Sequence, residues 1–130
     1  MATIKIFEDI SAWAKGRELS KEINIIINKN KSFDNYQSLV WQILKSTGSI
    51  MDNIAEGYER GGNREFIQFL AIAKGSTAEL RSQLYRAFDL DLISESEQSD
   101  LNSIAVEISK MINGLIKYLK SSDKKGYKFK

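Results

Sequence analysis

The chain has 130 residues, 42% of them hydrophobic and 28% charged, and its formal net charge at pH 7 is +2. This length and composition predict one globular domain with a hydrophobic core and argue against a disordered chain. The chain contains no histidine and no cysteine, which excludes thiol nucleophiles, Ser-His-Asp triads, zinc fingers and Glu-x-x-His di-iron sites. We therefore expect a protein that is not an enzyme, with no catalytic residue, metal or other cofactor.

The hydropathy pattern also bears on membranes. No apolar run approaches the roughly 18 residues that a bilayer-spanning helix needs. The first residues, Met1 to Lys5, lack the apolar core of a signal peptide. We expect a cytoplasmic protein that does not interact with membranes.

Four segments carry apolar residues at helical spacing, and the absence of proline permits long helices. The first covers about residues 10–30 and the second about 36–58, with Gly57 near its expected end and Gly61-Gly62 in the following turn. The third covers about 63–92 and begins at Asn63 as a predicted N-cap. The fourth covers about 96–120, after a predicted capping box formed by Ser94 and Glu97.

Short connections between these segments favour antiparallel neighbours. The sequence therefore predicts an all-α fold: an antiparallel up-down-up-down four-helix bundle over residues 1–120. Residues 121–130 are expected to form a basic C-terminal tail.

Two features predict contact with another copy of the chain. The third segment carries small residues on the stripe that faces away from its core positions: Ala71, Gly75, Ala78 and Ser82. Small residues let a second helix approach closely, and glycine costs about 1 kcal/mol in an exposed helix, so we interpret this stripe as an oligomer interface. Tolerated small surface residues are the alternative. On the charged outer face of the second segment, Trp41 is predicted to anchor a protein contact.

The same outer face carries Asp52 and Glu56, four residues apart. Two neighbouring carboxylates could hold a divalent cation, but without further ligands they make a weak site. An ion pair between Glu56 and Arg60, or with a basic residue of another helix, is the preferred interpretation. We expect no metal site here.

Charge is concentrated at the C-terminal end, where residues 110–130 hold seven lysines against one aspartate. Lysines here could complement the helix dipole and keep the tail soluble. They could also form a phosphate-binding patch, with Tyr127 and Phe129 interleaved. The predicted nucleic-acid contacts are five lysines and two supporting arginines: Lys110, Lys117, Lys120, Lys124, Lys125, Arg81 and Arg86.

One string of residues resembles a known family. Asn53-Ile54-Ala55-Glu56-Gly57, followed by Glu65-Phe66, Gly75-Ser76 and Glu79-Leu80, is similar to the bacterial four-helix bundle family called the 23S rRNA intervening-sequence or S23 family. The resemblance covers most of residues 7–93. Five polar or glycine positions of this motif are expected to be structural: Asn53, Glu56, Gly57, Glu65 and Glu79.

The resemblance implies a ring-shaped homopentamer, and some members are encoded within insertions in the large-subunit ribosomal RNA gene. A related branch includes the accessory variability protein of diversity-generating retroelements, a basic pentamer that binds nucleic acid and a reverse transcriptase. This chain departs from the pattern at Met51, where relatives often have proline, and at Ser46-Thr47, which replace a more basic stretch.

Two functions therefore stay open. The first is a non-catalytic accessory protein that binds RNA or an RNA/DNA hybrid through a basic surface. The alternative is a homo-oligomeric scaffold or adaptor for a protein partner such as a polymerase, which it would recognise through Trp41 and the acidic face of the second helix.

Overall fold

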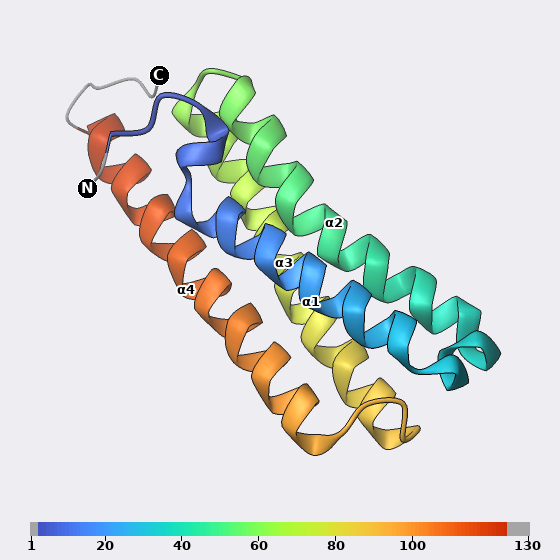
Figure 1. Ribbon diagram of the computed structural model, residues 1–130. Helices are drawn as coiled ribbons and strands as arrows, with labels where there is room; N and C mark the ends of the chain where they lie inside the picture. The colour runs from blue at the N-terminus through green and yellow to red at the C-terminus, as the bar shows by residue number, and fades with distance from the viewer. Residues whose placement is uncertain (1–2, 125–130) are drawn as a thin grey trace.

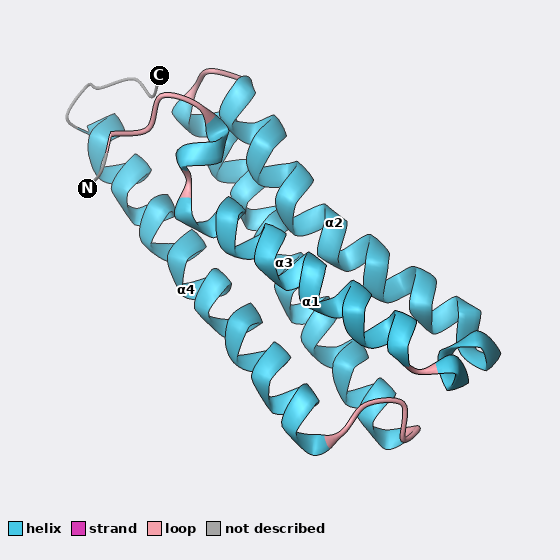
Figure 2. Cartoon of the chain, viewed as in Figure 1, coloured by secondary structure: helices cyan, strands magenta, loops and turns pink. Residues whose placement is uncertain are grey.

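The computed structural model describes residues 3–124, with side chains through residue 122, and four long helices form most of this range. They are α1 (Ser11–Lys29), α2 (Gln37–Glu59), α3 (Asn63–Asp89) and α4 (Glu95–Lys124). Two short 3-10 helices, η1 (Phe7–Asp9) and η2 (Lys31–Tyr36), precede α1 and α2. Residues 3–124 contain no β-strand (Figure 2).

The helices run alternately up and down, so each is antiparallel to the next along the chain (Figure 1). α1 packs against α2 and α4, and α3 packs against the same two helices, whereas neither diagonal pair is in contact within the described residues. This is a closed four-helix arrangement, and it confirms the predicted bundle. α2 and α3 form the most extensive of the four contacts.

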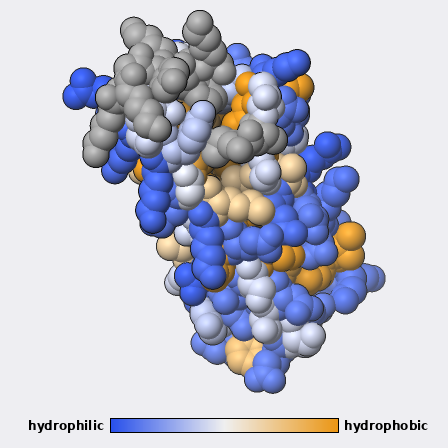
Figure 3. Space-filling view, turned by 90° about the vertical axis from the view of Figure 1, so that its left-hand side faces the viewer, coloured by the Kyte–Doolittle hydropathy of each residue, from blue (hydrophilic) through white to orange (hydrophobic). Residues whose placement is uncertain are grey.

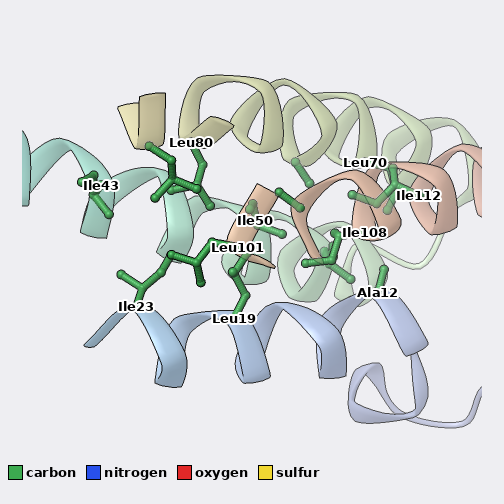
Figure 4. Packing of buried hydrophobic residues seen from close by; sticks show 14 of the residues in the cluster. Ala12, Leu19, Ile23, Ile43, Ile50, Leu70, Leu80, Leu101, Ile108 and Ile112 are labelled. Carbon is green, nitrogen blue, oxygen red and sulfur yellow. The ribbon is translucent and has the colours of Figure 1, made fainter. Parts of the chain in front are cut away.

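The core forms where the four apolar stripes meet on the bundle axis. Each helix contributes side chains that are fully buried, among them Leu19, Ile50, Leu80 and Ile108 (Figure 4). Burial of one such side chain stabilises the fold by about 1.5–3 kcal/mol. The helical spacing of apolar residues therefore identifies the face of each helix that is buried.

Helix α3 ends at Asp89, three residues before its expected end. The backbone N–H of Asp91 donates to Phe88, and that of Leu92 donates to Ala87, each at 2.9 Å. This pair of bonds is a Schellman motif. Its left-handed residue is Asp91, at φ 60°. Glycine usually occupies that position. Because aspartate takes its place here, no glycine marks the end of the helix in the sequence.

Helix α4 begins as predicted. The Ser94 hydroxyl accepts from the Glu97 N–H at 3.0 Å, and a Glu97 carboxylate oxygen accepts from the Ser94 N–H at 2.9 Å. The two bonds form the reciprocal capping box. The helix then continues to Lys124, four residues beyond its expected end.

The predicted N-cap at the α2–α3 turn was wrong. The N-cap position of α3 is Gly62 instead of Asn63. The buried Asn63 side chain donates to the carbonyl oxygen of Leu119 at 3.1 Å, which ties α3 to the end of α4. Gly57 lies inside α2, and a Cβ added to it would come within 2.6 Å of Phe69 Cβ. Gly57 therefore serves close helix packing, and Gly61, at φ +83°, makes the turn.

Within residues 3–124, none of the helices combines the length and the apolar character that crossing a bilayer requires.

Candidate nucleic-acid interface

Basic side chains of α3 and α4 meet along the outer edge where these helices pack. Lys74 Nζ donates to Asn113 Oδ1 at 3.0 Å, and Arg81 Nε donates to Asn102 Oδ1 at 2.9 Å. Both acceptors lie on α4, so these hydrogen bonds place two cations of α3 beside that helix. Lys74 was missed by the sequence analysis because nothing in its local sequence shows that it faces Asn113, which is 39 positions away.

The lysines of α4 extend this edge. Lys110 and Lys117 are exposed and lie three and four residues from Asn113, on the same helical stripe, and Lys120 continues it. Because Asn113 contacts Lys74, the stripe borders α3. We call the five cations the basic seam: Lys74, Arg81, Lys110, Lys117 and Lys120.

The charge of the basic seam has no close counter-charge among the side chains described for residues 3–122. None of its five cations forms an ion pair within the part of the chain whose side chains are described. Two carboxylates of α4 turn instead toward α1: Glu107 lies 3.7 Å from Lys15, and Glu97 lies 3.0 Å from Lys29. The side of the molecule on which α4 lies is mainly hydrophilic (Figure 3). α4 therefore carries its ion-paired carboxylates on the side that faces α1. Its lysines without an ion pair among the described side chains lie on the side that faces α3.

Other predicted contacts are not part of this seam. Arg86 donates to Gln42 Oε1 at 3.0 Å and so lies toward α2, on the opposite side of α3. Lys124 belongs to the last turn of α4, and its side chain is outside the described part. Lys125, Tyr127 and Phe129 all lie outside the described residues.

The stripe of small residues lies on the outer surface of α3. Ala71, Gly75, Ala78 and Ser82 are exposed. A Cβ added to Gly75 would meet no atom within 4 Å. In a single bundle this stripe has no packing partner among the described residues, so the chain alone offers no packing reason for the glycine.

The resemblance motif forms contacts that stabilise the α2–α3 turn. Arg60 lies 2.8 Å from Glu56 and 3.5 Å from Glu65, which confirms the expected ion pair with Glu56. The hydrogen bond from Arg60 to Glu56 is the main cause that raises the pKa of Arg60. Asn53 donates to the carbonyl oxygen of Ser49 one turn earlier, at 2.8 Å. Glu79, by contrast, is exposed and has no ion pair among the described side chains.

Metal binding finds no support in the acidic residues. Over the described part of the chain, no three or more Asp or Glu side chains are grouped closely enough to hold an ion. Asp52 is exposed, and Glu56 is already paired with Arg60.

The chain is similar to a family model and to solved structures. The model of the family described as 23S rRNA-intervening sequence protein matches residues 8–114. A crystal structure described as that of a protein with unknown function from the S23 ribosomal protein family of Bacteroides thetaiotaomicron is also similar. It is 28% identical with a TM-score of 0.69, and the match covers 82% of this chain and 98% of that one. No curated protein matches the chain.

Proposed function

Because this chain belongs to the 23S rRNA-intervening sequence protein family, we propose that it is a non-catalytic accessory protein that binds RNA through phosphates. The basic seam is the observation that carries the proposal. Five cations gather along one edge of the bundle, and none of them is paired with a carboxylate among the described side chains. Phosphate oxygens of a nucleic acid are natural ligands for such a row of lysine and arginine side chains.

The arrangement favours binding that depends little on base sequence. Lysine ammonium groups on long side chains contact phosphates without reading base edges. The cations lie along the bundle axis, because Lys110, Lys117 and Lys120 follow one another on α4. This geometry fits a stretch of nucleic-acid backbone better than a single phosphate.

The proposal includes assembly into a homo-oligomer through the small-residue stripe of α3. Ala71, Gly75 and Ala78 leave room for a neighbouring helix to approach. The resemblance suggests five subunits in a ring. Each copy would add one basic seam, so a ring gains avidity even if each seam binds weakly.

The test compares two triple variants that lose the same charge. In the first, Lys110, Lys117 and Lys120 are changed to Gln; in the control, the exposed Lys5, Lys21 and Lys31 are changed to Gln. Binding of a structured RNA is measured by light scattering and fluorescence anisotropy at about 50 and 300 mM salt. We expect the seam variant to lose affinity and about two to three units of the salt slope per bundle, because each phosphate contact contributes ~0.7–0.9.

The control variant should keep most of its affinity. Equal losses in both variants, or binding of the wild-type protein that does not change with salt, would contradict the proposal. An oligomer that ignores RNA at both salt concentrations would support the alternative scaffold function, with a protein such as a polymerase as partner. Ala78→Glu places a charge in the small-residue stripe and should dissociate the oligomer.

A further inference from the structure

A hollow of about 180 Å³ opens between α2 and α3, on the side of α3 opposite the basic seam. We call it the α2–α3 pocket. Its lining consists of seven polar or aromatic residues: Trp41, Gln42, Lys45, Ser46, Ser49, Glu79 and Gln83. Neither the basic seam nor the small-residue stripe uses any of them.

Hydrogen bonds beneath the pocket link α2 to α3. Asn53 Nδ2 donates to Ser49 Oγ at 2.9 Å, and the Ser76 hydroxyl donates to the carbonyl oxygen of Ile72 at 3.1 Å. The two serine oxygens lie 2.8 Å apart, and either hydroxyl can donate in this contact. Ser49 therefore already has partners within the chain.

Two lining side chains have oxygens without a partner among the described side chains. Gln83 is 9% exposed, and its Oε1 has no hydrogen-bond partner among the described residues. Glu79 contributes a carboxylate that has no ion pair in the described chain. The exposed Glu79 carboxylate is therefore available to a ligand that presents N–H donors.

The rim provides an aromatic face and positive charge. The Trp41 ring is 62% exposed, and Lys45 Nζ lies 4.8 Å from its centroid. Arg86 is held at the rim by its bond to Gln42. A cationic ligand would be repelled by Lys45 and Arg86, whereas a neutral flat group attached to an anion would be attracted by both.

We propose that the α2–α3 pocket binds the base of an unpaired guanine nucleotide, stacked on Trp41 with its Watson–Crick edge against Glu79. Guanine carries two adjacent N–H donors, at N1 and N2, which match the two oxygens of one carboxylate. Its O6 can accept a hydrogen bond from the Lys45 ammonium group, and Arg86 supplies positive charge for the phosphate. Adenine and cytosine each present only one exocyclic amino donor group, so neither matches the carboxylate as well.

This inference rests on the proposed function, because it names the kind of base that an RNA-binding protein would take from a single-stranded segment. Proteins commonly recognise such bases by stacking them on an aromatic side chain and bonding their edges. The basic seam would hold the backbone, and the pocket would add a preference for guanine.

The first experiment titrates three mononucleotides, the 5′-monophosphates of guanosine, inosine and adenosine, into the Trp13→Phe variant. The chain has two tryptophans, so fluorescence of this variant reports Trp41 alone. We expect guanosine monophosphate to quench the emission saturably. Inosine monophosphate lacks the N2 amino group and should bind about tenfold more weakly, the usual effect of losing a hydrogen bond to a charged group.

Calorimetry on variants locates the site. Trp41→Ala should weaken guanosine monophosphate binding by about five- to one-hundred-fold, the range for one stacked base. Glu79→Gln keeps the shape of the side chain and should weaken binding about tenfold or more. Tyr118→Ala removes another exposed aromatic residue, on α4, and should leave binding unchanged.

Three results would overturn the inference: no quenching, equal affinity for all three nucleotides, or an oligomer in which acrylamide cannot reach Trp41. The last would show that this face is a contact between copies of the chain. The seam variants separate this inference from the proposed function. Guanine binding without salt-dependent RNA binding would contradict the proposed function but not the pocket. Salt-dependent RNA binding without guanine binding would contradict the pocket but not the proposed function.

Discussion

Replacing Gly57 by alanine tests the close packing of α2 against α3. Alanine in place of glycine inside a helix normally stabilises a protein by about 0.5–1 kcal/mol. At this position the new Cβ would lie 2.6 Å from Phe69 Cβ and 2.9 Å from Phe66 Cδ1, against 3.4–4 Å for ordinary contact. Phe69 Cβ is bonded to the α3 backbone, so the clash is relieved only if the helices separate.

The magnitude follows from two opposing effects. Overpacking a core costs typically 1–3 kcal/mol, and the gain in helix propensity offsets up to about 1 kcal/mol of that. We therefore expect Gly57→Ala to lower the free energy of unfolding by about 1–2 kcal/mol. Gly48→Ala is the matched control, because Gly48 also lies in α2 and a Cβ there meets nothing within 4 Å. The control should gain about 0.5–1 kcal/mol.

The assay is thermal and urea unfolding of the two variants, followed by circular dichroism. A difference of about 2 kcal/mol between them corresponds to roughly 6–10 °C in Tm for a domain of this size. If Gly57→Ala were as stable as Gly48→Ala, the close approach of α2 and α3 at this point would be refuted. A loss in both variants would instead show that alanine is disfavoured throughout α2.

Other predictions concern caps and the outer surface of α3. Ser94→Ala removes the side-chain half of the capping box and should cost about 1 kcal/mol of stability, measured by urea unfolding at pH 7. The hydrogen bond from the Ser94 N–H lowers the pKa of Glu97 in the folded chain, and a hydrogen bond from Lys29 adds a smaller lowering. The stability that Glu97 adds is therefore complete above its unfolded pKa and lost as pH falls through the lower folded value. In Glu97→Gln this contribution to the pH dependence should disappear, and an acid unfolding curve unchanged from wild type would contradict the assignment. Gly75→Ala should raise the Tm of the dilute protein by a few degrees, because a Cβ there meets no atom within 4 Å; a fall in Tm at low concentration would show that the position is crowded within one bundle.

The elements of the fold were largely predictable because local signals are strong in this chain. Apolar residues at helical spacing located all four helices, and the Ser94 and Glu97 pair located the start of α4. Helix ends were less predictable. The α3 end depends on a left-handed Asp91, and η2 is a separate 3-10 helix that buries Phe33. Both depend on backbone conformations that no glycine or proline marks.

The sequence by itself determined the helical architecture and the face of each helix that enters the core, because these follow from a period of 3.6 residues within one segment. Only the tertiary structure decided which faces lie side by side. Lys74 meets Asn113 across the α3–α4 edge, and Arg86 turns instead to Gln42 on α2. Residues so far apart in the chain come together through the packing of whole helices, so no local pattern can place them in one site.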